Sequence, residues 1–351
     1  MGDPMDFTIY YNPYHNCRNM TISAMVMRLG ATLEYLFGQA GLFYKEEKNG
    51  VFITPYYRSL ESEFARSHGI FFHEDKITDA NQFITHLRRL VEKKHTVAVM
   101  LDIYELPYSI YYRDNHDYHD IEIVALEEER FVICDHHFQY YGVVDADVIQ
   151  KASLSLVHHL GIDACTSYYF TRPRDYTYHR DDFIRVLSEN CQAMKGKAID
   201  YLVQEAAGAY IGLQALEPMK IRITEFLTRN DQRQAAFLYE LYKMVKEISH
   251  SRHHFHLFLK AFDQEEIAFD FLEAAQHWAV ITNLLMRAYI TGGYNDVTDR
   301  VERRFDKLIE KEMQNLDNMA RLLAALTSDS NKKKRYASKE QRVQHKKALL
   351  P

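Results

Sequence analysis

The sequence lacks the features that mark several large classes of protein. Its four cysteines, Cys17, Cys134, Cys165 and Cys191, show no CxxC spacing, which argues against a disulfide framework and against a zinc site. It contains no GxGxxG or P-loop pattern, so it carries no nucleotide-binding signature. It also contains no internal repeat. These absences favour a protein from a reducing compartment, and we expect it in the cytoplasm.

Charge and hydrophobicity exclude further classes. A formal net charge of −6 gives no overall basic field, so the sequence predicts no nucleic-acid partner and no membrane partner. There is no basic stretch followed by an apolar run near the N-terminus and no long uninterrupted apolar segment, so neither a signal peptide nor a spanning helix is expected. What the sequence does have is apolar content: with 47% hydrophobic residues, 351 residues can bury a core in one or two domains.

Two regions of the chain differ in pattern. Residues 1–172 mix short apolar strands with a few helices, whereas residues 173–328 carry apolar side chains at three- and four-residue steps. We expect an α+β N-terminal domain followed by an all-α helical domain. The tail 329–351 is basic and nearly free of apolar residues, which predicts disorder. The expected long helices span 179–207, 219–248, 253–262, 265–291 and 296–327, with breaks at Gly208, Pro218 and Gly292-Gly293.

A thiol stands at the start of one predicted helix. In YHNCRNMTISAMVMRLG, residues 14–30, the helix should run from Cys17 to Arg28 and stop before Gly30. Unpaired amides at a helix start favour an anion, so a thiolate, the nucleophilic form, is favoured at this position. Taken alone, however, the pattern fits a structural cysteine better than a nucleophile.

A hairpin further along the chain supplies candidate partners for this thiol. HDIEIVALEEERFVICD predicts two strands, 119–125 and 130–135, joined by an acidic turn. Across such a hairpin, His119 lies opposite or diagonal to Asp135, so a carboxylate can reach an imidazole. With Cys17, these residues form the nucleophile, base and orienting group of papain-like thiol enzymes. A polar cross-strand pair without catalytic meaning stays open as the alternative.

Other residues are weaker candidates for the same chemistry. His116 competes with His119 as the base, but its position in a loop makes it the poorer choice. For an oxyanion, the backbone amide of Cys17 is the natural donor, and Asn12 or Asn16 could supply a side-chain amide.

Three histidine clusters raise the question of metal binding. DHH at 135–137 and HH at 158–159 have no second ligand set at a usable spacing. In HSRHHFH, His250, His253 and His254 share one helix face if the helix continues, and an exposed polar stripe explains them better than zinc. No metal is therefore expected.

Several segments resemble one known family, named for butirosin biosynthesis protein H. The chain opens with HNCRNMTISAMVMRLG and TLEYLFGQAGLFYK (32–45), similar to the family's His-Cys helix and its SE..LFG...G..F.Y segment. It continues with VMLDIYELPY (99–108), HDIEIVAL and FVICD, which resemble the family's D.Y.LPY strand and its hairpin headed by His and ended by Asp. The segments 239–262 and 271–288 are similar to the helical C-terminal region found with it. The resemblance covers most of residues 8–290.

The resemblance implies a cysteine acyltransferase on a fold similar to papain-like and bacteriocin-processing peptidases. The family's Cys, His and Asp fall on Cys17, His119 and Asp135. An acyl group would pass from the thioester of an acyl carrier protein, a peptidyl carrier domain or coenzyme A to an amine-bearing small molecule in antibiotic or other secondary-metabolite biosynthesis. No resident cofactor is then expected, because the partner or substrate carries the 4'-phosphopantetheine thioester.

The resemblance also implies substrate-binding residues. Those on the D.Y.LPY strand, which would line an acyl or amine pocket, are Asp102, Tyr104, Leu106, Pro107 and Tyr108. Glu34, the glutamate of the SE segment, is a further candidate, although Leu33 stands where the family usually has Ser. In the C-terminal region, SHSRHHFH replaces the family's glycine-rich stretch, so neither the acceptor nor the carrier surface is carried over.

Two other functions stay open at this stage. The same three residues would serve a cysteine hydrolase or peptidase, in which water instead of an amine resolves the acyl-enzyme. A non-catalytic scaffold of a biosynthetic cluster would keep the fold without using the triad, and its Cys17 would react with iodoacetamide no faster than the other cysteines. The helical domain fits a lid, a docking surface for the carrier or a homodimer interface.

Overall fold

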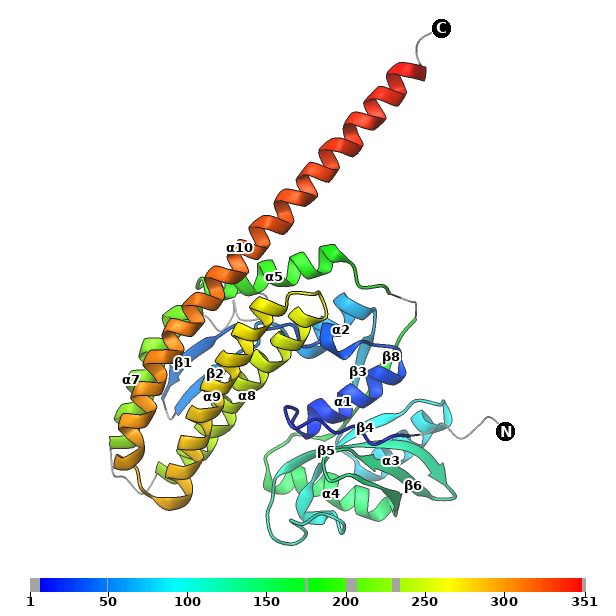
Figure 1. Ribbon diagram of the computed structural model, residues 1–351. Helices are drawn as coiled ribbons and strands as arrows, with labels where there is room; N and C mark the ends of the chain where they lie inside the picture. The colour runs from blue at the N-terminus through cyan, green and yellow to red at the C-terminus, as the bar shows by residue number, and fades with distance from the viewer. Residues whose placement is uncertain (1–6, 49, 174–175, 200–206, 229–233, 349–351) are drawn as a thin grey trace. The chain divides into compact units, whose positions relative to one another are not determined.

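The computed structural model shows an α+β protein, as the sequence predicts (Figure 1). The chain separates into two compact units, neither of which is contiguous: unit 1 comprises Met1–Leu36 and Glu61–Thr177, and unit 2 comprises Phe37–Leu60 and Tyr178–Pro351. The structure describes residues 7–48, 50–173, 176–199, 207–228 and 234–348, the side chains of 234–235 and 329–348 excepted.

Unit 1 is built on a six-stranded sheet whose neighbouring strands are all antiparallel. In spatial order the strands are β3 (Phe71–Ile77), β8 (Cys165–Thr171), β4 (Val97–Asp102), β5 (Tyr118–Glu127), β6 (Arg130–Asp135) and β7 (Tyr140–Val144). The helices of the unit are α1 (Cys17–Arg28), α2 (Leu60–His68), α3 (Ala80–Glu92) and α4 (Ala146–His159), with 3-10 turns η1 (Leu33–Tyr35) and η2 (Ile103–Glu105).

The two faces of this sheet differ in polarity. Side chains alternate along β4 and β5, so Val99 and Ile121 face one side, where they pack in a core with residues of α3 and α4 such as Phe83. The alternate positions of β5, Asp120 and Glu122, are fully buried on the side of α1. Figure 1 shows α1 and α4 on opposite sides of the sheet. Helix α1 therefore covers a polar face.

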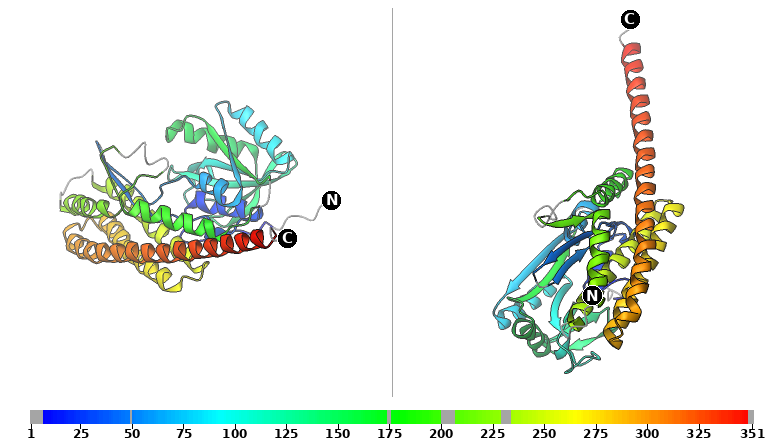
Figure 2. Two further views of the ribbon diagram at one scale, coloured as in Figure 1. Left: turned by 90° about the horizontal axis from the view of Figure 1, so that it is seen from above. Right: turned by 90° about the vertical axis from the view of Figure 1, so that its left-hand side faces the viewer.

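Unit 2 combines a small antiparallel sheet with long helices (Figure 2). Its strands follow the order β2 (Gly50–Thr54), β1 (Phe43–Glu47) and β9 (Ala209–Ile211). Its described helices are α5 (Arg180–Met194), α7 (Leu216–Thr228), α8 (Gln234–Lys260), α9 (Glu265–Thr291) and α10 (Asn295–Ala348), with the 3-10 turn η3 (Gly212–Ala215). Helix α10 packs along α5, α7 and α9 through the predicted apolar stripe, in which Val301, Phe305 and Leu308 are fully buried.

The units differ from the domains expected from the sequence in two ways: unit 2 is not all-α, because β9 lies within it and joins a three-stranded sheet, and one further segment belongs to it. Residues 37–60 were expected within the N-terminal domain, but they belong to unit 2. The reason is a long-range pairing: Tyr44 of β1 lies opposite Tyr210 of β9. Such a pairing leaves no local pattern in the sequence.

Four of the expected helix boundaries are wrong. The helix expected over 219–248 is two helices, α7 and α8, of which α7 ends at Thr228. Helix α5 ends at Met194 and not at 207, because Gly196 follows with a left-handed φ of 89°; residues 200–206 lie outside the described part. The expected break near 249–252 is absent, since α8 runs to Lys260. Pro218 does not break α7 but lies in its first turn, where a missing amide proton costs nothing.

The tail also differs from the expectation of disorder. Helix α10 continues to Ala348, and residues 349–351 lie outside the described part. No proline or glycine occurs between Asn295 and Ala348, and the tail is rich in Lys, Arg and Gln, which are good helix formers. Low hydrophobicity therefore did not end this helix.

The histidines of α8 do not form the exposed stripe expected from the sequence, because two of them are buried and His253 is half-buried. His250 and His254 are almost completely inaccessible. Burial lowers the pKa of His250 to about 3 and that of His253 to about 4. Next to them, the fully buried Arg252 pairs with Glu312 at 2.8 Å. These polar residues belong to the interior of unit 2.

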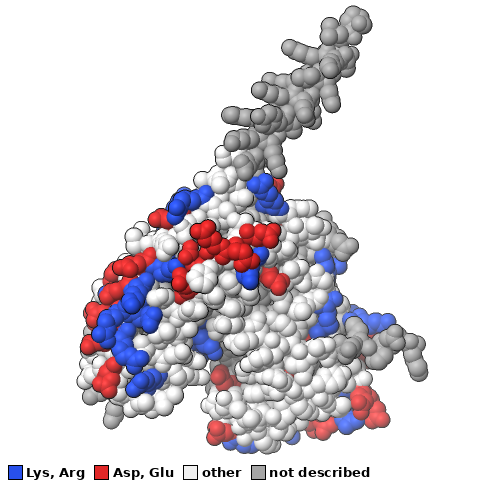
Figure 3. Space-filling view, in the orientation of Figure 1, with Lys and Arg blue, Asp and Glu red and all other residues white. Residues whose placement is uncertain are grey.

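Charges of both signs cover the helices of unit 2. In Figure 3, basic and acidic side chains lie side by side over these helices. Two ion pairs typify the pattern, Lys220 with Asp306 at 2.6 Å and Lys311 with Asp270 at 2.7 Å. Within the described residues, no helix combines the length and apolar character needed to cross a membrane.

Candidate active site

The thiol of Cys17 stands at the first position of α1, as predicted. Asn16 is the N-cap, and its side-chain oxygen accepts a hydrogen bond from the Asn19 amide at 2.8 Å. The helix ends at Arg28, and Gly30 adopts a left-handed φ of 81° directly after it. The local sequence therefore accounts fully for the position of the cysteine at a helix start.

The two expected oxyanion donors have other described partners. Asn16 uses its oxygen for the helix cap. Asn12 accepts from the Tyr14 amide at 2.9 Å and donates to the Tyr10 hydroxyl at 3.2 Å. The backbone amide of Cys17 is the donor that the helix start itself supplies.

The hairpin of β5 and β6 places the base and its carboxylate on one face. Past a bulge at Val124, Glu122 pairs with Cys134, and continuing this register puts Asp135 and His119 on the same face as diagonal neighbours. Without the bulge, Asp135 would pair with Glu122 and would face away from His119. The one-residue shift therefore decides whether the carboxylate can reach the imidazole.

Cys17, His119 and Asp135 form one hydrogen-bonded chain. Nε2 of His119 lies 2.7 Å from Oδ2 of Asp135, and the same imidazole hydrogen-bonds the thiol of Cys17. Because Nε2 is occupied by the carboxylate, Nδ1 is the ring nitrogen left for the sulfur. His119 and Asp135 are buried, whereas Cys17 is half-buried.

Four donors hold the Asp135 carboxylate. The Tyr108 hydroxyl donates to Oδ2 at 3.1 Å, and the backbone amides of His137 and Phe138 donate to Oδ1 at 3.0 Å each. The fourth donor is His119. Burial favours the neutral acid, but these hydrogen bonds outweigh it and lower the pKa of Asp135. The carboxylate is therefore ionised and fixed in orientation.

The imidazole of His119 favours its charged form. Burial opposes the charge, but the hydrogen bonds to Asp135 and Cys17 raise the pKa of His119 to about 10. Near neutral pH the ring carries a proton on each nitrogen. One N–H donates to the carboxylate, and the other is directed at the sulfur, which is the charge arrangement that stabilises a thiolate.

Of the expected substrate-binding residues, Tyr108 is the one that contacts the hydrogen-bonded chain of Cys17, His119 and Asp135. Its ring stacks on Tyr140 with centroids 4.0 Å apart, and its hydroxyl donates a hydrogen bond to Asp135. Glu34 is exposed in η1, and the contacts described for it do not include Cys17, His119 or Asp135.

Asp102 and Tyr104 belong to a neighbouring cluster around His116. The buried Asp102 carboxylate accepts from Nδ1 of His116 and from the Ser155 hydroxyl, both at 2.7 Å. The Tyr104 and His159 rings stack on His116 at 4.1 and 4.3 Å. His116 therefore has its own carboxylate, and its described contacts do not include Cys17.

Sequence reasoning missed three residues around the nucleophile and base. Asp120, directly after His119, is fully buried and accepts from the Tyr168 hydroxyl at 3.1 Å. Arg18, directly after Cys17, lies over the Tyr168 ring at 5.4 Å from its centroid. The available signal was a carboxylate at position 120, between the candidate base and the apolar Ile121 of a predicted strand; nothing in the sequence pointed to Tyr168.

A second buried histidine lies on the α1 face of the same hairpin. Nε2 of His136 lies 3.1 Å from Glu122, and its Nδ1 accepts from the Tyr10 amide at 3.0 Å. Arg28 also pairs with Glu122. Burial and the nearby Arg28 guanidinium lower the pKa of His136 to about 4, so this imidazole is neutral.

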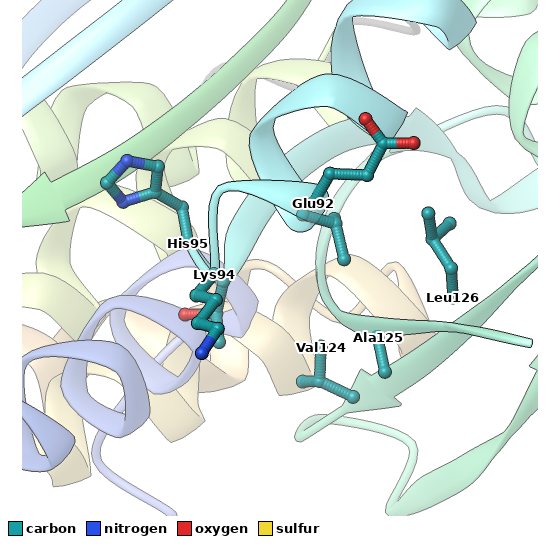
Figure 4. Close-up of a pocket in the computed structure, with 8 residues that line it drawn as sticks. Glu92, Lys94, His95, Val124, Ala125 and Leu126 are labelled. Atoms are coloured by element: carbon teal, nitrogen blue, oxygen red, sulfur yellow. The ribbon is translucent and has the colours of Figure 1, made fainter. Parts of the chain in front are cut away.

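One cavity of unit 1 lies away from these residues. It has a volume of about 350 Å³ and opens where α3 ends against the bulged part of β5. Figure 4 shows its wall, with His95 and Leu126 on opposite sides. The residues that line it are Val91, Glu92, Lys94, His95, Thr96, Val124, Ala125 and Leu126. None of the expected site residues is among them. In the part of the chain that the structure describes, no cluster of three or more His, Cys, Asp or Glu side chains could hold a metal ion.

A cysteine at a helix start, hydrogen-bonded to an imidazole that a buried aspartate orients, is the arrangement found in thiol-dependent enzymes. Residues 13–136 match the family model described as butirosin biosynthesis protein H, N-terminal. The matched region contains all three residues of the hydrogen-bonded chain, and over these residues the resemblance noted in the sequence is confirmed. No curated protein matches the chain with significant similarity.

Proposed function

We propose that the protein is a cysteine-dependent N-acyltransferase of a biosynthetic pathway, with Cys17 as nucleophile, His119 as acid and base, and Asp135 as the residue that orients His119. The observation that carries the proposal is the continuous hydrogen bonding from the thiol through the imidazole to a carboxylate with four donors. The family match, to a region named for the biosynthesis of butirosin, supports a biosynthetic role.

In the first half-reaction, the Cys17 thiolate attacks the carbonyl carbon of an acyl thioester. The tetrahedral intermediate collapses by breaking the bond to the donor sulfur, and the His119 imidazolium gives its proton to that departing thiolate. The acyl group is then held on Cys17 as a thioester. Exchange of one thioester for another is nearly balanced in free energy, so the step needs neither a metal nor a nucleotide.

In the second half-reaction, an amine attacks the Cys17 thioester. His119, now neutral, accepts a proton from the attacking nitrogen, and the Cys17 thiolate leaves with the bonding electrons. Loss of the thiol partner on acylation removes one of the two hydrogen bonds that raise the pKa of His119. The ring is then a better base for the incoming amine at the moment it is needed.

The donor in this proposal is a 4'-phosphopantetheine thioester on an acyl carrier protein, a peptidyl carrier domain or coenzyme A. The acceptor is an amine-bearing small molecule. We also propose that unit 1 has a papain-like architecture, because the helix-borne cysteine and the hairpin-borne histidine and aspartate follow that chain order and placement.

The proposal is tested by intact-protein mass spectrometry after incubation with a panel of acyl-phosphopantetheine thioesters. We expect a mass increase equal to the acyl group on the wild-type protein and none on Cys17→Ala. Cys165→Ala is the matched control, because this buried thiol lies in the same unit and should be dispensable for loading.

Adding amines or water to the loaded protein separates transfer from hydrolysis. Faster loss of the adduct with an amine, together with amide formation, supports the transferase. Loss at one rate whatever the amine supports a cysteine hydrolase. If no thioester of a broad panel loads Cys17, and Cys17 reacts with iodoacetamide no faster than the other cysteines, the protein is a scaffold and the proposal fails.

A further inference from the structure

We propose that Arg18, Asp120 and Tyr168 form a positioning cluster that holds the Cys17 thiol against His119. The inference rests on the proposed function, since it assigns these residues to the same pair of reacting groups. None of the three touches the reacting atoms in the described contacts, so each is a positioning residue.

Two residues of the cluster directly follow the nucleophile and the base in the chain. Arg18 follows Cys17 in the first turn of α1, and Asp120 follows His119 in β5. A second tie lies one turn further along α1, where the buried Thr21 hydroxyl donates to the backbone oxygen of Asp120 at 3.2 Å. Because neighbouring residues move together, contacts that link Arg18 to Asp120 through Tyr168, and Thr21 to Asp120 directly, also hold the thiol and the imidazole at one separation.

The contacts within the cluster run from Arg18 through Tyr168 to Asp120. The Arg18 guanidinium lies over the Tyr168 ring, and the Tyr168 hydroxyl donates to Oδ1 of Asp120. The charge of Arg18 also favours the ionised form of Asp120. Glu61 of α2 also forms an ion pair with Arg18 at 2.5 Å, which helps to orient the guanidinium. Three elements, α1, β5 and β8, therefore meet at one buried point.

Burial of the Asp120 carboxyl group lowers the stability of the folded protein. Its side chain is fully buried, and its Oδ2 has no hydrogen-bond partner among the described residues. Burial raises the pKa of Asp120 to about 6, against the charge of Arg18, the charge of His119 and the Tyr168 hydrogen bond, which lower it. A raised carboxyl pKa means that the fold loses stability as pH rises from about 4 to about 6. A residue that weakens the fold at neutral pH needs a reason other than stability.

The test measures the reaction of Cys17 with iodoacetamide, which needs no knowledge of the natural substrate. Peptide mass spectrometry reports Cys17 separately from the three buried cysteines. At pH 7, we expect Asp120→Asn to lower the alkylation rate of Cys17 by about 10- to 100-fold, because a misplaced base no longer supports the thiolate. The melting temperature of Asp120→Asn should be equal to or above that of the wild type.

Two further variants separate charge from shape. Arg18→Gln should lose reactivity to a similar extent, whereas Arg18→Lys keeps the charge and should lie closer to the wild type. Glu122→Gln is the matched control: it changes another buried carboxylate of β5 on the α1 face, two residues along, and should leave the Cys17 rate unchanged in the folded protein.

The pH profile gives a readout that a merely structural role would not change. The charged or titratable groups that act on Asp120 are Arg18 from α1, Tyr168 from β8 and His119 from its own strand. With the negative charge removed, the charged form of His119 loses support, so the loss of the His119 charge, and the change in alkylation rate that accompanies it, should begin at lower pH in Asp120→Asn.

Each outcome bears on one of the two proposals. If wild-type Cys17 alkylates fast and Asp120→Asn alkylates equally fast, the positioning cluster is refuted, whatever acyl loading shows. If Asp120→Asn is slow only in proportion to a lowered melting temperature, the cluster is structural and the inference also fails. A slow, stable Asp120→Asn supports it, and acyl loading of the wild type then decides the proposed function separately.

Discussion

The hairpin of β5 and β6 carries two buried histidine–carboxylate pairs, one on each face, and they behave in opposite ways. His119 with Asp135 has a raised pKa of about 10, whereas His136 with Glu122 has a lowered pKa of about 4. Both histidines are almost fully buried, so burial alone does not explain the difference.

The neighbours of each pair explain it. A thiol that can become an anion lies beside His119, while a guanidinium that is already a cation, Arg28, lies beside His136 and competes for Glu122. A carboxylate therefore does not by itself make a histidine basic; the net charge around the pair decides. The four predictions below test this comparison, from the largest effect to the smallest.

Replacing the carboxylate of the first pair should have the largest effect. Asp135→Asn keeps the size of the side chain but removes the charge that holds Nε2–H of His119, so acyl loading of Cys17 should fall by about 10²- to 10⁴-fold. The rate of loading from a thioester donor measures it. A loss below tenfold would show that Asp135 is not needed to orient His119.

Replacing the carboxylate of the second pair should act on stability instead. Glu122→Gln leaves Arg28 without its buried partner, and we expect a loss of about 3 kcal/mol in the free energy of unfolding. Urea denaturation measures this loss, and acyl loading of the folded variant should stay near the wild-type rate. A large drop in loading would mean that the two faces of the hairpin are not independent.

The two histidines should shape opposite limbs of the stability curve against pH. His119 has a raised pKa, so its contribution is complete below about 6.5 and is lost as pH rises toward 10; His136 has a lowered pKa, so the fold loses stability as pH falls from 6.5 toward 4. Urea denaturation between pH 4 and 10 tests both. His119→Gln should flatten only the alkaline limb, and His136→Gln only the acid limb.

The smallest effect is expected from replacing Tyr108, whose hydroxyl is one of the four donors to Asp135. Tyr108→Phe removes one of four hydrogen bonds to Asp135, which corresponds to about 1 kcal/mol, or about fivefold in the loading rate. Tyr140→Phe, whose ring also stacks there, is the control. Equal rates for Tyr108→Phe and the wild type would mean that three donors suffice.

Local pattern predicted the parts of the site that depend on local sequence. The start of α1 near Cys17 followed from the apolar run that ends before Gly30, and the hairpin followed from alternation around an acidic turn. The bulge at Val124 could not be read in the same way, because an extra residue in a strand leaves the composition unchanged. It decides the faces of His119 and Asp135, which the sequence could only place within one or two residues of each other.

The missed parts depend on contacts between distant segments. Tyr168 lies far along the chain from Asp120, and its role comes from the neighbouring strand order of β8, β4 and β5. Tyr104 and Asp102 lie on the segment where the family resemblance put substrate-binding residues, but their partners, His116 and Ser155, turn them into a separate cluster. Side-chain partners of this kind are set by the fold and not by a motif.

The excursion of residues 37–60 out of unit 1 has a consequence for how the protein is made. During translation, β1 and β2 leave the ribosome long before β9, which completes their sheet. Until β9 is synthesised, the apolar side chains of Phe43 and Tyr44, which are buried in the folded protein, stay exposed. A shortened gene that ends after β8 would keep every residue of the hydrogen-bonded chain but leave this segment permanently unpaired. Such a fragment should precipitate, and the two halves should be soluble only when they are synthesised together.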